Sequence, residues 1–316
     1  MIWIERPQTD PWFNLAAEEF ILKHFPEDIL MLWQSTSSVV VGKHQNTVAE
    51  VDTNFTEVNH IPIIRRISGG GTVYHDLGNL NYTFIKSTDR DNYPVDFKTF
   101  TKPLIEFLRN YQLDVRFEGK NNLRVGNKKF SGNAAHVFKN RVMHHGTILF
   151  ETDLEKLEKV IQSKQGQYTD KAIKSVRTEV VNLSQLLTPA IKLNYFKTQF
   201  KHFLTDYFNI KNIRQFTDDQ SIAIRKLAET KYKSWAWNMG YSPKFTVHKK
   251  VETAYGHIRA NLQVKAGIID ELDLYFEDKK LIKIEDQLRH HPYKKIELLN
   301  QLEGNRFSET LVNALF

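Results

Sequence analysis

The 316-residue chain contains no cysteine. This absence excludes disulfide bonds, thiolate metal sites and a cysteine nucleophile. No apolar run approaches the roughly 18 residues that a membrane-spanning helix needs. The first residues, Met1-Ile2-Trp3-Ile4-Glu5, also lack the basic and apolar regions of a signal peptide. We therefore expect a cytoplasmic protein that does not bind a membrane.

Strong charge of one sign is also missing. The chain has 44 lysines and arginines against 37 acidic residues, a net charge of +7, and its basic residues are scattered rather than grouped in blocks. Apolar residues make up 41% and charged residues 26%, as in ordinary globular proteins. The positive surface would attract anions of many kinds, so charge alone does not predict a nucleic-acid site.

Helical and strand patterns are intermixed without regular alternation, which predicts an α+β fold with mixed or antiparallel sheets and flanking helices. Asp10-Pro11 is typical of a helix start, and Thr152-x-x-Glu155 of a capping box that opens a second helix. The apolar patterns predict helices over 97–111, 153–161 and 193–208, and strands over 29–33, 39–41, 61–64 and 82–85.

The pattern changes near Gly240 and Pro243, two residues that interrupt regular structure. Residues 245–278 predict three or four strands, and helical patterns follow near 293–302 and 308–315. We therefore expect a large domain over residues 1–242 and a small α+β domain over 245–316.

A run of three glycines, Gly69 to Gly71, lies between an arginine pair and a strand pattern. Glycine backbone can approach a ligand closely and present its N–H groups to an anion, and Arg66 adds a planar cation suited to phosphate or carboxylate. The spacing matches neither a P-loop nor a dinucleotide fingerprint. The sequence predicts an anion-binding loop, although such a run is also typical of a flexible turn.

A second candidate follows the Gly126-Asn127 turn, where Lys128 and Lys129 begin a strand. Alternation along a strand directs one of the two lysines inward, where its ammonium would meet a phosphate or carboxylate. The alternative is that both lysines only flank the turn and remain solvated.

Histidines form the third candidate. His144 and His145 are adjacent in a strand pattern and therefore point to opposite faces, which argues against their binding one metal ion. His75 admits an acid–base, metal or structural role from its position alone.

Together with these three motifs, several further segments resemble the lipoate–protein ligases, relatives of biotin ligases and class II aminoacyl-tRNA synthetases. They are Pro11-Trp12-Phe13-Asn14-Leu15-Ala16-x-Glu18-Glu19, Val39-Val40-Val41-Gly42-x-x-Gln45-Asn46, Arg65–Asn81, Lys129-Phe130-Ser131-Gly132, His144-His145-Gly146-Thr147, Ser175-Val176-Arg177, Ser234-Trp235-x-Trp237-Asn238-x-Gly240 and Pro243-x-Phe245.

The resemblance implies an ATP-dependent enzyme that converts lipoate into lipoyl-AMP, releases pyrophosphate, and transfers the lipoyl group to a lysine of an acceptor domain. The acceptors would be the lipoyl domains of 2-oxoacid dehydrogenase complexes and the glycine-cleavage H protein. It further implies Mg²⁺ with the nucleotide. We also expect a monomer without a nucleic-acid partner, although no motif determines the oligomeric state. Because the acceptor lysine is itself the nucleophile, the chain's lack of cysteine agrees with this chemistry, whereas transferases that work through a thioester are excluded.

The resemblance also assigns roles to residues. Lys129 would be catalytic, contacting both the lipoate carboxylate and the α-phosphate, and no metal ligand is assigned. The ATP and adenylate site would comprise Arg66, Ser68, Gly71, Thr72, Val73, Tyr74, Asn122 and Lys129, and the lipoate site Trp33, Gly70, His75, Lys129 and His145.

One residue departs from the family pattern, since Asn122 stands where the family typically has aspartate. An amide carries no charge to orient a lysine or hold a metal, so two outcomes are open: Asn122 preserves the hydrogen bonding, or it slows adenylation. Slower adenylation would suit a lipoyltransferase that uses preformed lipoyl-AMP. A third alternative, a basic nucleic-acid-binding regulator on the same fold, predicts a basic stripe with interleaved aromatics or a helix-turn-helix segment, and the sequence shows neither. The motifs do not separate lipoate from octanoate.

Overall fold

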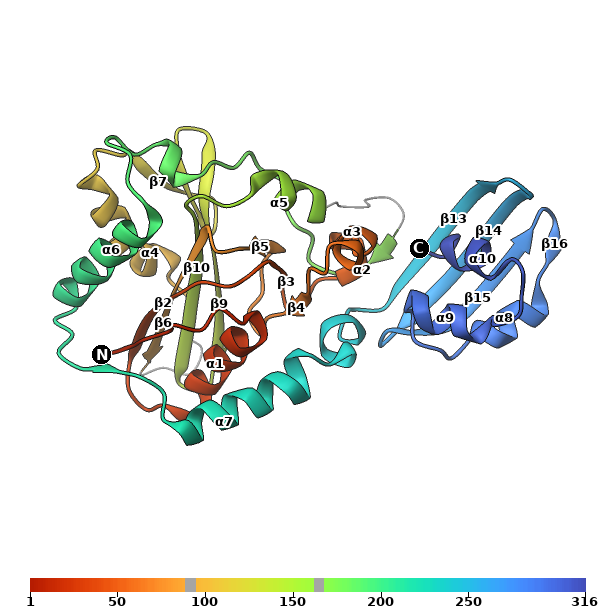
Figure 1. Cartoon of the computed structure of the whole chain (residues 1–316), viewed down its shortest axis with the longest axis horizontal. Coiled ribbons are helices and arrows are strands. Elements are labelled where there is room, and N and C mark those ends of the chain that lie inside the picture. The colour runs from red at the N-terminus through yellow and green to blue at the C-terminus, as the bar shows by residue number, and fades with distance from the viewer. Residues whose placement is uncertain (89–94, 162–167) are drawn as a thin grey trace. The chain divides into compact units, whose positions relative to one another are not determined.

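The computed structural model describes residues 1–88, 95–161 and 168–316. The chain forms two compact units (Figure 1). Unit 1 contains Met1–Lys43, Asp52–Ile161 and Ser175–Lys233, and unit 2 contains His44–Val51, Gln162–Lys174 and Ser234–Phe316. No helix in the described ranges has both the length and the apolar character to cross a membrane.

Unit 1 is built on an eight-stranded sheet with the order β12-β1-β2-β6-β10-β9-β8-β7. Strand β1 runs parallel to both of its neighbours, and the other pairs are antiparallel. The strands are β1 (Ile2–Ile4), β2 (Ile29–Trp33), β6 (Asn79–Ser87), β7 (Val115–Glu118), β8 (Asn122–Val125), β9 (Lys128–Phe138), β10 (Arg141–Leu149) and β12 (Ile213–Arg214).

A small sheet in the same unit carries the glycine run. It has the order β4-β3-β5, with β3 parallel to β4 and antiparallel to β5. Its strands are β4 (Ile63–Arg65), β3 (Ser38–Val41) and β5 (Val73–His75). The glycines therefore lie in the loop that joins β4 to β5, and the mixed sheets with flanking helices confirm the predicted fold class.

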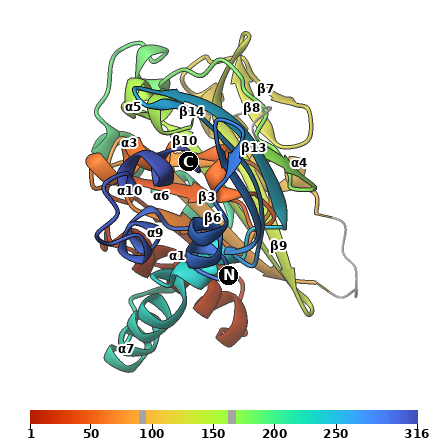
Figure 2. The same cartoon turned by 90° about the vertical axis from the view of Figure 1, so that its right-hand side faces the viewer.

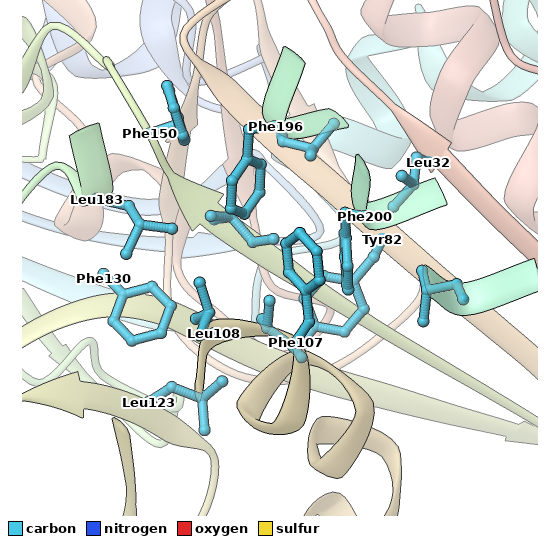
Figure 3. Close-up of a cluster of buried hydrophobic side chains, with 14 of the residues drawn as sticks. Leu32, Tyr82, Phe107, Leu108, Leu123, Phe130, Phe150, Leu183, Phe196 and Phe200 are labelled. Carbon is cyan, nitrogen blue, oxygen red and sulfur yellow. The ribbon is translucent and has the colours of Figure 1, made fainter. Parts of the chain in front are cut away.

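Helices flank the large sheet on both faces. One face is covered by α4 and α6 through the apolar cluster shown in Figure 3, in which Phe107 of α4 lies 5.4 Å from Phe196 of α6 between ring centroids. The opposite face carries α1. The helices of unit 1 are α1 (Pro11–His24), α3 (Thr53–Val58), α4 (Phe97–Arg109), α5 (Leu154–Val160), α6 (Leu193–Tyr207) and α7 (Asp218–Leu227), followed by a π-helical turn at Ala228–Tyr232.

One of the two predicted helix starts is confirmed and the other is wrong. The carboxylate of Asp10 accepts the N–H of Phe13 at 2.8 Å and caps α1. Helix α5 is capped by Asp153, which accepts the N–H of Lys156 at 2.8 Å, and not by Thr152. Thr152 is buried and held by tertiary contacts, because its N–H donates to the Asn182 side chain at 3.0 Å. Aspartate is as good an N-cap as threonine, so the helix begins one residue later.

Unit 2 contains a five-stranded antiparallel sheet with the order β11-β13-β14-β15-β16. Helices α8 to α10 pack on one face of it (Figure 2). The elements are α2 (Thr47–Glu50), β11 (Tyr168–Asp170), a π-helical turn at Ala236–Gly240, β13 (Phe245–Thr253), β14 (Gly256–Lys265), β15 (Ile268–Phe276), β16 (Lys279–Lys280), α8 (Ile282–Leu288), α9 (Lys295–Gln301) and α10 (Ser308–Asn313).

The core of unit 2 includes residues from early in the chain. Val48 and Tyr168 are both buried in the apolar cluster formed mainly by residues after 244. The Asn46 amide donates to Asp170 at 2.9 Å, and the Thr47 hydroxyl donates to the carbonyl of Asn238 at 2.8 Å. Three separate stretches of sequence therefore make this unit.

Candidate active site

The glycine loop follows β4 and needs glycine at specific positions. Gly70 has φ +85°, a left-handed conformation that residues with a side chain rarely adopt, and a Cβ there would lie 3.1 Å from the Arg66 guanidinium. At Gly71 a Cβ would lie 3.1 Å from the hydroxyl of Ser175. A substituent at Gly69 would meet nothing within 4 Å. The loop is thus a tight backbone turn at its last two glycines.

Arg66 is buried and its guanidinium holds this loop. Its Nη2 donates to the carbonyls of Gly69 and Gly71 at 2.6 and 2.7 Å, and its Nη1 donates to the carbonyl of Val40 at 3.1 Å. The Nε donates to the hydroxyl of Ser68 at 3.0 Å. Burial lowers the pKa of Arg66 to about 10, so the side chain still carries its charge at neutral pH.

Ser68 connects Arg66 to a histidine and a buried carboxylate. The Ser68 hydroxyl lies 2.6 Å from Nε2 of His145, and Nδ1 of His145 lies 2.9 Å from a carboxylate oxygen of Glu18 on α1. Thr83 donates to the same carboxylate at 2.6 Å and accepts from the Trp33 indole at 2.9 Å. Glu18 is not among the site residues predicted from the sequence. It belongs to the family-like segment that ends at Glu19, but no role was attached to it.

His144 faces away from this network, as the alternation of a strand predicts. Its ring stacks on Phe100 of α4, with 4.8 Å between centroids and an interplanar angle of 10°. Within the described ranges no group of three metal-binding side chains exists. The two adjacent histidine side chains point to opposite faces of the sheet, as predicted.

His75 and Trp33 form an aromatic pair beside the loop, with 5.6 Å between their ring centroids. Neither nitrogen of the buried His75 ring has a hydrogen-bond partner in the described part of the chain. Burial, with smaller contributions from Arg66 and His145, lowers the pKa of His75 to about 3. At neutral pH the ring is therefore uncharged and holds an unused donor and acceptor.

Lys129 enters a pocket of about 430 Å³, whereas Lys128 points outward and pairs with Glu179 at 2.9 Å. The prediction that one of the two lysines faces inward is confirmed. The pocket is lined by Thr72, Val73, Tyr74, Lys129, Ser131, Gly132, Thr147, Leu149, Leu154, Leu157, Glu158, Ile161, Ser175, Val176, Arg177, Thr178, Glu179 and Val180.

The ammonium of Lys129 loses its proton more readily than that of an exposed lysine. Burial, followed by the nearby charges of Arg124 and Arg66, lowers the pKa of Lys129 to about 8. A Cβ on Gly132 would lie only 2.9 Å from the Lys129 ammonium, so glycine makes room for the cation. Among the described residues, the charges that act on this ammonium are those of the two arginines, and no carboxylate offsets them. A cation without a protein counterion in a pocket is suited to an anionic ligand.

The structure brings together four of the residues predicted for the nucleotide site, Thr72, Val73, Tyr74 and Lys129, in the wall of this pocket. The others lie outside its lining. Asn122 is on β8 opposite Gly132 in the strand ladder. Arg66, Ser68 and Gly71 belong to the hydrogen-bonded network of the glycine loop. The residues predicted for the lipoate site lie in or beside the same network: Gly70, His145, Trp33 and His75.

Sequence reasoning missed the apolar wall of the pocket. Leu154, Leu157 and Ile161 lie on or directly after α5, and Leu149 ends β10. These residues carry no motif, because apolar residues in a helix usually predict core packing. Arg177 was part of a family-like segment, but no role was attached to it.

Comparison with known proteins identifies the protein family to which the chain belongs. Residues 10–205 match the model of the lipoyl protein ligase A/B catalytic domain, and residues 242–314 match that of the bacterial lipoate protein ligase C-terminus. The lipoate-protein ligase LplJ of Bacillus subtilis is 33% identical over 312 residues, which cover 96% of this chain and 94% of the relative.

Solved structures agree with this class. A bi-partite lipoate protein ligase of Thermoplasma acidophilum, studied with its E2 lipoyl domain, matches with TM-score 0.65 and 26% identity over 76% of this chain and 96% of its own. Lipoate-protein ligase A bound with ATP matches with TM-score 0.64 and 27% identity over 76% of this chain and 98% of its own. The chain belongs to the lipoate–protein ligase family.

Proposed function

We propose that this enzyme activates lipoate with ATP and then transfers the lipoyl group to a lysine of an acceptor domain. The observation that carries the proposal is Lys129, a cation without a carboxylate partner in the described chain, at the wall of a pocket next to a glycine loop. Activation brings a carboxylate and a triphosphate together, so the site must offset the repulsion between two anions.

In the first step, a lipoate carboxylate oxygen bonds to the α-phosphorus while the bond to pyrophosphate breaks. Lys129 contacts both groups and stabilises the negative charge at phosphorus. In the second step, the acceptor amine attacks the acyl carbon, an amide forms, and AMP leaves with the bonding electrons. The amine proton passes to solvent, and no enzyme nucleophile takes part.

The nucleotide would occupy the Lys129 pocket. Val73 and Tyr74 of β5, with Thr72 directly before them, form one edge of it, and the leucines of α5 form an apolar wall suited to a base. Arg66, Ser68, Gly71 and Asn122 would be its neighbours on the phosphate side. Because Arg66 already donates to the loop carbonyls, its contribution would be to shape the loop as well as to supply charge.

Lipoate would bind beside the glycine loop. Trp33 and His75 supply flat ring surfaces, and the free nitrogens of His75 offer a polar contact. Gly70 permits close approach of the chain, and His145 lies on the same side of the large sheet as α1. The carboxylate end would point to Lys129.

Magnesium would accompany the triphosphate. Mg²⁺ typically keeps several waters and takes one or two carboxylates plus phosphate oxygens, and it rarely needs a protein cage. Two carboxylates, Glu158 and Glu179, line the pocket. The described ranges contain no cluster of three or more acidic or histidine side chains that could enclose a metal ion. These residues fit a substrate-borne ion, which would neutralise phosphate charge when bound.

The proposal extends to partners and organisation. The acceptors would be lipoyl domains of 2-oxoacid dehydrogenase complexes and the glycine-cleavage H protein, a choice supported by the E2 lipoyl domain studied with the Thermoplasma ligase. The enzyme would act as a cytoplasmic monomer. Residues 1–242 would carry catalysis, and residues 245–316 would form an accessory domain.

Asn122 favours a second candidate, a lipoyltransferase that uses preformed lipoyl-AMP. It pairs with Gly132, the glycine that makes room for the Lys129 ammonium, so an aspartate there would lie near this cation. Because the Asn122 amide is neutral, the adenylation step lacks the negative charge that an aspartate would place near Lys129. Restoring the carboxylate with Asn122→Asp would then raise the adenylation rate but not the transfer rate.

Exchange of labelled pyrophosphate into ATP in the presence of lipoate tests the main proposal, because only a self-sufficient ligase carries it out. Lys129→Ala should reduce exchange on the order of 100-fold, and Lys129→Met tests the same loss with the side-chain volume kept. A wild-type enzyme that transfers from lipoyl-AMP without exchange would support the transferase. Full exchange by Lys129→Ala would remove Lys129 from the chemistry.

A further inference from the structure

Glu18 is a buried carboxylate to which neither the family features nor the pocket give a role. It lies on α1 with 1% exposure and contacts β6 through Thr83 and β10 through His145. Two chains of hydrogen bonds begin at this one carboxylate. One leads to the glycine loop and the other to Trp33.

The first chain has a defined direction. The Nε of Arg66 can only donate, so the Ser68 oxygen accepts from it at 3.0 Å. The Ser68 proton can then be donated to Nε2 of His145, 2.6 Å away, if that nitrogen carries no proton. This places the ring proton on Nδ1, where it faces the Glu18 carboxylate at 2.9 Å. One arrangement of protons satisfies every member of the chain.

The second chain is shorter. Thr83 donates its hydroxyl proton to Glu18 at 2.6 Å, so its oxygen is free to accept from the indole N–H of Trp33 at 2.9 Å. Trp33 in turn packs against His75. The carboxylate therefore fixes both the ring on the proposed lipoate side and the arginine that shapes the loop.

We propose that Glu18 is a positioning residue: its carboxylate sets the tautomer of His145 and so holds Ser68, Arg66 and the glycine loop in the geometry that receives the two anionic substrates. The inference rests on the proposed function for its effect on rate. The tautomer itself does not depend on that function.

The charges around Glu18 support an ionised carboxylate. Burial alone would raise the pKa of Glu18, but the hydrogen bonds from His145 and Thr83 and the charge of Arg6 together lower it. The negative charge of the same carboxylate also raises the pKa of Arg66, against the lowering effect of burial. Replacing Glu18 with glutamine would leave two buried guanidinium groups without this anion and would put an N–H₂ group beside the histidine.

The test compares Glu18→Gln with Glu19→Gln. Glu19 is the next residue of α1, is equally buried, and contacts Lys23, Lys231 and Tyr232 without touching His145. Glu19→Gln therefore removes one buried negative charge from the same helix and serves as the matched control. The tautomer of His145 is read from the ¹⁵N shifts of labelled histidine, and kcat/KM for lipoate from pyrophosphate exchange.

We expect the Nδ1–H tautomer in the wild type and in Glu19→Gln, and a shift toward Nε2–H in Glu18→Gln. The kcat/KM of Glu18→Gln should fall about tenfold or more, with that of Glu19→Gln near the wild-type value. An unchanged tautomer with unchanged kcat/KM in Glu18→Gln would overturn the proposal. Failure of the wild type to exchange pyrophosphate would instead count against the proposed function, and the tautomer would still be decisive for Glu18.

Ser68→Ala supplies a second test should Glu18→Gln not fold. It cuts the same chain on the other side of His145 and leaves the carboxylate in place. The expected result is a similar fall in kcat/KM, with the Nδ1–H tautomer retained because Glu18 is still present. Wild-type kcat/KM in this variant, or loss of the tautomer, would contradict the chain as described.

Discussion

At the scale of single residues, the charge of Lys129 is the property most open to experiment. Its pKa is lowered to about 8, because burial and two neighbouring arginines disfavour the ammonium. Below that pH the free enzyme carries the charge, and above it the charge is lost. The ligand-free site is therefore cationic at neutral pH and much less so in mildly alkaline buffer.

The pH dependence of kcat/KM follows from this. If Lys129 must be charged to receive the anions, kcat/KM for pyrophosphate exchange should fall about tenfold per pH unit above pH 8. Arginine keeps its charge in this range, so any residual activity of Lys129→Arg should lack that fall. A wild-type profile that stays flat to pH 10 would contradict the assignment.

Gly132 gives a second prediction at this scale. A methyl group there would lie 2.9 Å from the Lys129 ammonium and 3.0 Å from its Cε, and the flexible end of the lysine would have to move. Gly132→Ala should lower kcat/KM about tenfold or more, since small displacements of a positioned charge are costly. Thermal unfolding should change little. Unaltered kinetics would show that the ammonium works from another position.

The sequence predicted the inward lysine because alternation in a strand is a local rule. It did not predict that the Arg66 guanidinium would be occupied by Ser68 and the loop carbonyls, nor that Glu18 would join them. These contacts join residues up to 127 positions apart, and no local pattern encodes such separations. Roles in phosphate and lipoate binding stay predictions.

At the scale of elements, the start of α5 shows how two good caps compete. Asp153 caps the helix, while the buried hydroxyl of Thr152 has no hydrogen-bond partner among the described residues. Both residues suit the same position, and tertiary contacts to Asn182 decide between them.

These two residues respond differently to substitution. Asp153→Ala should lower the free energy of unfolding by about 1 kcal/mol, the usual cost of an N-cap. Thr152→Val keeps the shape and removes an unpaired hydroxyl, so it should be neutral or stabilising. Urea unfolding of both variants checks the prediction. A larger loss of unfolding free energy in Thr152→Val than in Asp153→Ala would show that Thr152 caps the helix, as the capping-box prediction states.

Apolar periodicity predicted the helices that bury a broad face, and missed those that do not. Helix α4 presents Phe100, Leu104, Phe107 and Leu108 to the core, and its pattern is plain. Helix α7 buries only Ile224, so it was not predicted, although Thr217 and Gln220 form a true capping box at its start. The cap was a signal that could have been used.

At the scale of the whole molecule, unit 2 is assembled from three stretches of chain. The change in pattern near Gly240 was visible in the sequence, but the packing of Val48 and Tyr168 with residues after 244 was not. Such contacts depend on the tertiary fold alone. The domain limits 1–242 and 245–316 remain a prediction.

Removing residues 243–316 should therefore do more than delete a domain. Val48 and Tyr168 would lose the apolar cluster that buries them, at a cost of roughly 1.5–3 kcal/mol for a fully buried apolar side chain. We expect the shortened chain to bind a hydrophobic dye and to unfold at a lower temperature than the full chain. Equal melting temperatures without dye binding would show that the early segments have partners elsewhere.

The interleaving of the two units also has a consequence for biosynthesis. His44–Val51 leaves the ribosome about 180 residues before Ser234, where the last stretch of unit 2 begins. At 5–20 residues per second, that delay lasts about 10–40 s. Throughout this interval a nascent polypeptide carries an exposed Val48 whose burial awaits the final quarter of the chain, which makes it a natural client for chaperones acting during translation.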